Sequence, residues 1–171
     1  EHRDGILDVT TVPARISTDQ ADEARRLASR LAMALDYVGV MAVEFFVTTS
    51  GNLLVNEIAP RPHNSGHYTL DACITSQFEQ QVRMLCGLPA GDTHLLTPVV
   101  MTNLLGDIWS GGTPCWDCLF AEPGVKLHLY GKEDPRPGRK MGHFCYLHED
   151  TGHARKRSRE LLAALPRKSV A

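Results

Sequence analysis

The sequence predicts an α+β protein whose two parts differ in texture. Residues 1–94 show a helical pattern, a hairpin of two apolar strands and a second helical pattern. Residues 95–171 contain short strands separated by turns rich in glycine and proline, and then one amphipathic helix. Because strands that follow one another through short turns pair antiparallel, we expect antiparallel sheets with helices, followed by a small β-rich domain.

A first helix is expected directly after Ser17. Ser17 and Gln20 have the spacing of a capping box, and Leu27, Leu31 and Leu35 recur at helical spacing. The stretch "VGVMAVEFFV" then changes to β-branched and aromatic residues, which are typical of a strand.

Residues 38–59 read as a β-hairpin with its turn centred near Ser50 and Gly51. In that register paired residue numbers sum to 101, which sets Glu44 opposite Glu57. Like charges directly opposite each other destabilise a sheet unless they are neutralised, and Mg²⁺ together with phosphate oxygens would do so. The alternative is that one or both glutamates face water, because a register slip of one residue would separate them.

A polar loop follows the hairpin, where Pro60 and Pro62 prevent the strand from continuing. Arg61 could bind a planar oxyanion through two hydrogen bonds, and His63 could exchange a proton near neutral pH. Asn64 and His67 belong to the same loop. The alternative is a polar surface loop with a histidine packed on a neighbour.

A second helix is expected at about 72–86. Its apolar stripe would consist of Ile74, Phe78, Val82 and Leu85, with Gly87 and Pro89 at its end.

The later part of the chain offers three strands and a helix. The strands lie within 97–106, 125–132 and 140–149, and the helix within 151–165. The helix is expected to bury Ala154, Leu161, Leu162 and Leu165. It would turn outward Arg155, Lys156, Arg157 and Arg159, either as a solvated face or as a contact for an acidic partner.

The segment "YGKEDPRPGRKMGH" concentrates cations around two prolines and two glycines. Its basic residues include Lys132, Arg136, Arg139 and Lys140. A stiff loop can hold such cations against a phosphate at little entropic cost. A charged hairpin turn is the alternative.

The cysteines allow two interpretations. Cys115 and Cys118 form a C-x-x-C pair that could bind zinc together with Cys145 and His148. An odd total of five cysteines, scattered along the chain, instead favours reduced thiols in a cytoplasmic protein.

Composition excludes several classes of protein. The chain has 171 residues, of which 43% are hydrophobic, so it can bury a core. Its net charge of −2 provides no basic field for nucleic acid, and no apolar run approaches the ~18 residues that span a bilayer. The sequence starts at Glu1 rather than methionine, and we expect it to be a portion of a longer protein.

Four segments together resemble one family. "GVMAVEFFVTTSGNLLVNEIAPRPHNSGHYT", "SQFEQQVRMLCGLP", "VVMTNLLGD" and "LYGKEDPRPGRKMGH" are similar, in that order, to the C-terminal half of 5-(carboxyamino)imidazole ribonucleotide synthases, ATP-grasp enzymes of purine biosynthesis. The resemblance implies that residues 1–94 are the C-terminal part of an ATP-grasp domain and that 95–171 are a small C-terminal domain.

The resemblance also implies an ATP-dependent carboxylation. ATP would phosphorylate bicarbonate to carboxyphosphate, and the amine of aminoimidazole ribonucleotide would capture the carbon, leaving ADP and phosphate. Glu44 and Glu57 would hold Mg²⁺ (or Mn²⁺) against ATP, with Asn56 and His2 beside the nucleotide.

The remaining implied roles concern bicarbonate and the ribonucleotide. Arg61, His63 and Lys132 would be the catalytic residues. Substrate would be bound by Asn64, Ser65, Lys132, Arg136 and Arg139. The alternatives are another ATP-grasp ligase, such as formate-dependent glycinamide ribonucleotide transformylase, or a non-catalytic zinc or interaction module. We expect a cytoplasmic homodimer for the full-length protein, and no turnover from this chain alone, because the other walls of the site are missing.

Overall fold

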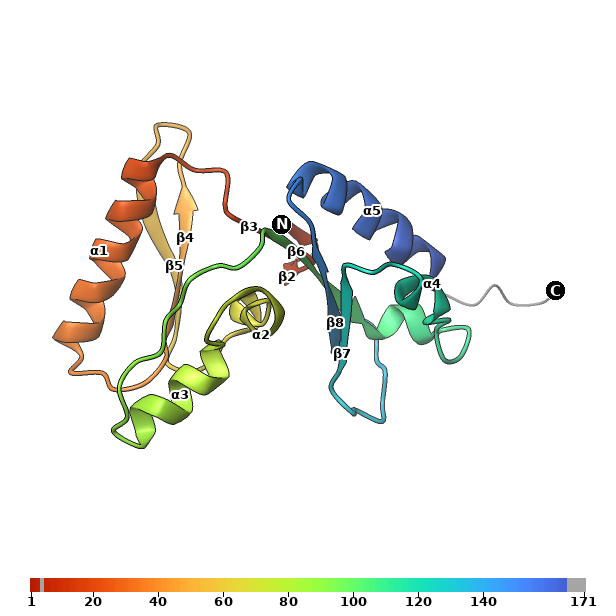
Figure 1. The fold of residues 1–171 in the computed structure, drawn as a ribbon. Coiled ribbons are helices and arrows are strands. Elements are labelled where there is room, and N and C mark those ends of the chain that lie inside the picture. The colour runs from red at the N-terminus through yellow and green to blue at the C-terminus, as the bar shows by residue number, and fades with distance from the viewer. Residues whose placement is uncertain (4, 166–171) are drawn as a thin grey trace. The chain divides into compact units, whose positions relative to one another are not determined.

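The computed structural model describes residues 1–3 and 5–165, which form two compact units (Figure 1). The hairpin unit comprises Ala14–His94, and the sheet unit comprises Glu1–Pro13 together with the chain from Leu95 onward. No helix among the described residues is long and apolar enough to cross a membrane.

The hairpin unit places one long helix beside a two-stranded antiparallel sheet (Figure 1). Its elements are α1 (Thr18–Ala34), β4 (Ala42–Val47), β5 (Leu53–Ala59), the 3₁₀ turn η1 (Asn64–Gly66), α2 (Thr69–Ala72) and α3 (Gln77–Leu85). The predicted capping box is confirmed: the Gln20 amide N–H donates to the Ser17 side chain, and the Ser17 N–H donates to the Gln20 side chain.

The β4–β5 register pairs Glu44 with Glu57, as predicted, but the hairpin reaches it by a different route. In the half of the hairpin next to the turn, the numbers of paired residues sum to 100, as for Phe45 and Val55. In the half farther from the turn they sum to 101. The uniform register expected from the sequence is therefore wrong. Asn56 is the extra residue of a β-bulge, a feature that bends one strand and redirects side chains.

The single helix expected at about 72–86 is two separate helices in the structure. The chain is helical over α2, becomes extended at Cys73 (φ −123°, ψ 157°), and re-enters a helix only at Gln77. Ser76 causes the later start, because its side chain accepts the Glu79 amide N–H as an N-cap. The expected apolar stripe is not buried in this chain: its side chains are 37–67% exposed, namely Ile74, Phe78, Val82 and Leu85.

The sheet unit is built on a four-stranded antiparallel sheet in the order β3-β6-β8-β7. Its strands are β3 (Val9–Val12), β6 (Val99–Leu105), β7 (Val125–Leu129) and β8 (Lys140–Leu147), and β1 (His2–Arg3) pairs separately with β2 (Ile6–Leu7). Its helical elements are η2 (Gly106–Trp109), α4 (Asp117–Phe120) and α5 (Thr151–Ala164). The three predicted later strands and the final helix are confirmed.

The first thirteen residues belong to the sheet unit because β3 pairs with β6. The division into domains at residue 94, predicted from the sequence, remains a prediction. The two compact units differ from this division only in the first thirteen residues, which belong to the sheet unit.

The core of the sheet unit lies between the sheet and α5, which runs along it in Figure 1. Phe144 on β8 is fully buried at its centre. Its buried neighbours are Leu104, Leu119, Leu161 and Leu165. Three of the four side chains expected to be buried on the helix are buried, and Leu162 packs against the cluster while partly exposed.

The basic residues of α5 are largely paired rather than simply solvated. Arg155, expected to point outward, is 24% exposed and forms an ion pair with Glu1. Arg157 donates to Glu122 at 2.7 Å, and this hydrogen bond lowers the pKa of the Glu122 carboxyl. At the start of the helix, amide N–H groups of His153 and Gly152 lower the pKa of the capping Asp150.

Candidate functional site

Two opposed glutamates and a histidine form the centre of the candidate site in the hairpin unit. His63 Nδ1 lies 3.5 Å from Glu44 Oε1, and His63 Nε2 lies 4.0 Å from Glu57 Oε1. The His63 side chain is 13% exposed and that of Glu57 is 55% exposed, so the cluster is open on the Glu57 side. A cationic imidazole in this position would be attracted to both carboxylates.

The bulge in β5 explains how Asn56 joins this cluster. An uninterrupted strand would place the side chains of residues 56 and 57 on opposite faces. Because Asn56 is the extra residue, its amide Nδ2 reaches Glu44 Oε2 at 3.4 Å while Glu57 still lies opposite Glu44. Two carboxylates, one amide and one imidazole therefore converge on one part of the hairpin.

The loop after β5 orients His63. The His63 Nδ1 atom is 2.8 Å from the Ser65 hydroxyl, and Ser65 belongs to the short turn η1. Asn64 begins this turn, and Arg61 is exposed just before it, with its guanidinium donating to the Pro62 carbonyl at 3.1 Å. The predicted residues of this loop thus lie within a few positions of the glutamate pair.

Three of the predicted cations of the sheet unit, Lys132, Arg136 and Arg139, lie on the loop between β7 and β8, and Lys140 is the first residue of β8. Lys132 Nζ donates to the Lys140 carbonyl at 2.6 Å and lies 5.4 Å from the centre of the Tyr130 ring. Asp134 orients both arginines: Arg136 Nε donates to its carboxylate at 2.5 Å, and Arg139 donates to its carbonyl at 2.9 Å. Each of these three cations therefore donates a hydrogen bond to an oxygen of the same loop or of Lys140. The stiffness expected from the prolines and glycines remains a prediction. His2 is exposed on β1.

Gly106 determines how closely this loop approaches β6. A Cβ at this position would lie 2.1 Å from the Arg136 carbonyl oxygen, and the Gly106 N–H donates to the Arg139 carbonyl at 2.9 Å. We expect Gly106→Ala to displace the loop and to accelerate tryptic cleavage after Lys132 and Arg139 roughly tenfold, because overpacking against backbone cannot be relieved by a side-chain rotation.

The control for Gly106→Ala is Gly152→Ala in α5. There the new Cβ would meet only the end of the Asp150 side chain, at 3.1 Å. This variant should be cleaved at the wild-type rate. Equal cleavage of both variants would show that Gly106 does not hold the loop.

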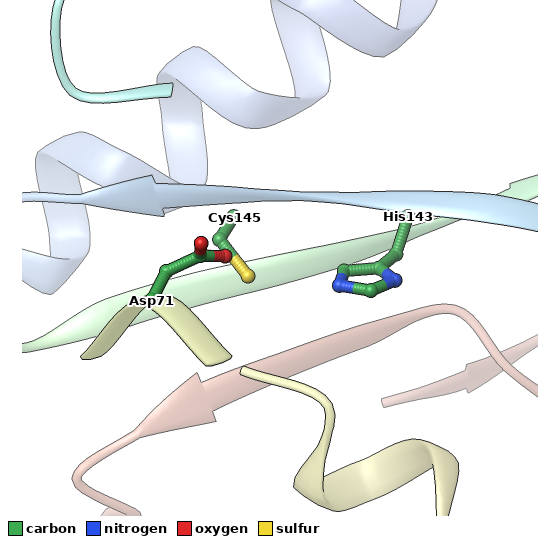
Figure 2. Close-up of side chains that lie close together, drawn as sticks. All are labelled: Asp71, His143 and Cys145. Carbon is green, nitrogen blue, oxygen red and sulfur yellow. The ribbon is translucent and has the colours of Figure 1, made fainter. Parts of the chain in front are cut away.

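The zinc set considered from the sequence does not assemble among the described residues. No three of Cys115, Cys118, Cys145 and His148 bring ligand atoms within 4.8 Å of one another. Cys145 is fully buried on β8, with His143 on the same strand (Figure 2), while His148 Nδ1 accepts the Asp150 amide N–H. The zinc interpretation is therefore wrong for the described part of the chain.

Sequence reasoning missed two groups of polar side chains. Tyr130 directly follows β7, and its hydroxyl lies 2.8 Å from His143 Nδ1 on β8, while the ring of His128 on β7 stacks on His143 at 4.6 Å. In the hairpin unit, Gln77 is buried and binds the backbone of His63. The only signal in the sequence was a polar residue directly after an N-cap, which does not reveal a partner in a loop.

Two family models match successive segments of this chain. The family model described as ATP-grasp domain matches residues 1–78, and the one described as Phosphoribosylaminoimidazole carboxylase C-terminal domain matches residues 99–157. The N5-carboxyaminoimidazole ribonucleotide synthase of Brucella melitensis is 51% identical over 146 residues, covering 85% of this chain and 39% of that protein. Over most of its length the chain is similar to the C-terminal part of N5-carboxyaminoimidazole ribonucleotide synthases.

Solved structures of N5-carboxyaminoimidazole ribonucleotide synthetases are similar to this chain as well. The crystal structure from Thermotoga maritima matches with 46% identity and a TM-score of 0.85, covering 92% of this chain and 44% of that one. The Aspergillus clavatus synthase, solved in complex with ADP and 5-aminoimidazole ribonucleotide, matches with 31% identity and a TM-score of 0.84, covering 96% and 45%. The expected α+β fold class is confirmed, and the chain spans about two fifths of the length of the curated relatives it matches.

Proposed function

We propose that this chain supplies the C-terminal part of an ATP-grasp ligase that carboxylates 5-aminoimidazole ribonucleotide with bicarbonate, giving N5-carboxyaminoimidazole ribonucleotide, ADP and phosphate in purine biosynthesis. The observation that carries the proposal is the cluster of Glu44, Glu57 and His63 in a chain that both family models match. The carboxylase description of the second model favours bicarbonate over formate as the one-carbon substrate.

Glu44 and Glu57 are the proposed ligands of Mg²⁺. Their carboxylates come from directly paired residues of adjacent strands, and hard oxygen ligands of this kind suit Mg²⁺ when phosphate oxygens complete its coordination. When bound, the ion would neutralise charge on the ATP phosphates. Asn56 holds Glu44 through its side-chain amide and would lie beside the nucleotide.

Arg61 and His63 are proposed to position bicarbonate and carboxyphosphate. An exposed guanidinium can form two parallel hydrogen bonds with a planar oxyanion, and the imidazole can hold or release a proton next to it. Ser65 orients the His63 ring through its hydroxyl, and Asn64 stands next to it in the turn.

The sheet unit is proposed to bind the phosphate of the ribonucleotide. Lys132, Arg136 and Arg139 supply positive charge on one loop, and His2 would contact the nucleotide. The Aspergillus clavatus synthase was solved with ADP and 5-aminoimidazole ribonucleotide, which supports these two ligands as the molecules bound. A homodimeric state and a cytoplasmic location of the full-length protein are part of the proposal and follow from the family resemblance alone.

The test is ADP release by the full-length protein with ATP, Mg²⁺, bicarbonate and aminoimidazole ribonucleotide. We expect turnover only when all four are present, because the phosphorylated bicarbonate must be captured by the amine. The 171-residue chain alone should release no ADP. Turnover with formate in place of bicarbonate, or turnover independent of the ribonucleotide, would contradict the proposed function.

A further inference from the structure

Helix α3 fastens the surrounding backbone of the hairpin unit through three glutamine side chains. Gln77 binds the peptide groups of His63, Gln80 binds those of Gly91, and Gln81 accepts the Val40 amide N–H at 2.6 Å. Two of these contacts use both ends of the side-chain amide. Only the one made by Gln77 is directed at a residue of the candidate site.

The Gln77 amide pairs with His63 as a neighbouring strand would. His63 N–H donates to Gln77 Oε1 at 2.9 Å, and Gln77 Nε2 donates to the His63 carbonyl at 2.8 Å. Because a backbone N–H can only donate and a carbonyl can only accept, this pair fixes which end of the amide is oxygen. Gln77 is 9% exposed, so both hydrogen bonds are shielded from water.

The same side chain fixes the state of a second histidine. Gln77 Nε2 lies 2.7 Å from His67 Nδ1, and an amide nitrogen can only donate. His67 Nδ1 must therefore accept, which requires a neutral imidazole with its proton on Nε2. The side-chain amide of Gln77 is thus hydrogen-bonded to both histidines of the loop.

The loop is shaped to fit around Gln77. A Cβ on Gly66 would lie 2.6 Å from Gln77 Oε1, so the backbone approaches the amide closely only because residue 66 is glycine. Thr69 contacts both partners, since its hydroxyl donates to the Gly66 carbonyl at 2.7 Å and accepts the backbone N–H of Gln77 at 2.9 Å. Three residues of this loop, His63, His67 and Thr69, are therefore hydrogen-bonded to Gln77.

We propose that Gln77 is a positioning residue that holds the His63 ring between Glu44 and Glu57. Two hydrogen bonds to the His63 peptide groups fix its backbone dihedrals, and the backbone sets where the ring lies between the carboxylates. The inference rests on the proposed function, because it gives the position of His63 a catalytic consequence. A misplacement of about 1 Å at a reacting group can lower a rate about 10²-fold.

The test compares Gln77→Leu with Gln80→Leu in the full-length protein. Gln80→Leu is the matched control, because it removes the same two-ended contact from the same helix but frees Gly91 rather than His63. We expect Gln77→Leu to lower kcat about 10- to 100-fold with KM for ATP changed less than about twofold. Gln80→Leu should leave kcat within about twofold of wild type, and equal losses in both variants would overturn the proposal.

Gln77→Glu keeps the shape of the side chain and serves if Gln77→Leu does not fold. Its carboxylate still accepts from His63 N–H but repels the His63 carbonyl, whereas the protonated carboxyl can donate to it. His67 Nδ1 faces the same side-chain atom at 2.7 Å, and a protonated His67 would lower the pH at which this carboxyl gains its proton. We therefore expect the ratio of variant to wild-type kcat to rise as the pH is lowered toward the carboxyl pKa. A constant ratio would argue against positioning by this hydrogen bond.

A second readout separates this inference from the proposed function. The His63 amide proton should exchange with solvent about tenfold faster in Gln77→Leu than in Gln80→Leu, because only the first loses its acceptor. Absence of bicarbonate-dependent ADP release by the wild type would refute the function and leave the exchange result standing. Unchanged exchange in Gln77→Leu would refute the positioning role even in an active enzyme.

Discussion

Replacing Glu57 with glutamine is expected to lower kcat of the full-length enzyme about 10²- to 10³-fold, the size of effect seen when one preorganised electrostatic contact is removed from an active site. The substitution keeps the shape of the side chain and removes one of the two opposed charges. Glu57 is 55% exposed and lies 4.0 Å from His63 Nε2, so little packing is lost. ADP release measured over a range of Mg²⁺ concentrations checks the prediction, with a higher Mg²⁺ requirement expected in the variant.

The matched control for this charge change is Glu23→Gln on α1. The Glu23→Gln substitution also removes a carboxylate from the hairpin unit, but the partner of Glu23 is Arg26 on the exposed face of the helix. Exposed pairs of this kind contribute little to stability, so activity should stay at the wild-type level. Normal turnover of Glu57→Gln would mean that Glu57 is not a ligand of the metal.

The opposition of Glu44 and Glu57 was predicted although the register next to the turn was not, because the bulge at Asn56 shifts the pairing by the one residue that separates the two registers. A hairpin turn fixes the partners of nearby residues, and the position of the turn can be read from the Ser50-Gly51 sequence. The bulge at Asn56 could not be predicted in this way. It depends on how the end of β5 is held by its surroundings, and one extra residue leaves no distinct pattern in the sequence.

Pairings between strands that lie far apart in the chain could not be predicted from the sequence. Val9 lies opposite Thr102 across the β3–β6 pair, and nothing in the short apolar stretch around Val9 indicates that partner. The start of α3 was missed for another reason. The apolar spacing of Ile74 and Phe78 continues the helical pattern across Ser76, but the N-cap hydrogen bond and the extended Cys73 break the helix there.

The same distinction between local patterns and distant contacts applies to the residues of the candidate site. His63 was accessible to sequence reasoning because two prolines placed it in a loop behind a strand that carries a glutamate. Gln77 was not, since its role depends on the path of that loop around α3. A residue that acts by holding another residue has no chemistry of its own to mark it in the sequence.

Phe144→Ala is expected to lower the free energy of unfolding of the sheet unit by about 3–5 kcal/mol, the range for removing a large buried aromatic side chain. Phe144 is fully buried against Leu104 and Leu161, so its truncation leaves a cavity lined by side chains from the sheet and from α5. Urea unfolding followed by tryptophan fluorescence is specific for this unit, since Trp109 and Trp116, the two tryptophans of the chain, pack against the same cluster.

Phe120→Ala provides the comparison within the same unit. Phe120 is 70% exposed at the end of α4, so the same chemical change removes little buried area and should alter the unfolding free energy by less than about 0.5 kcal/mol. The difference between the two variants therefore isolates burial from the loss of the ring itself. Similar losses in both would mean that the core of the sheet unit is not centred on Phe144.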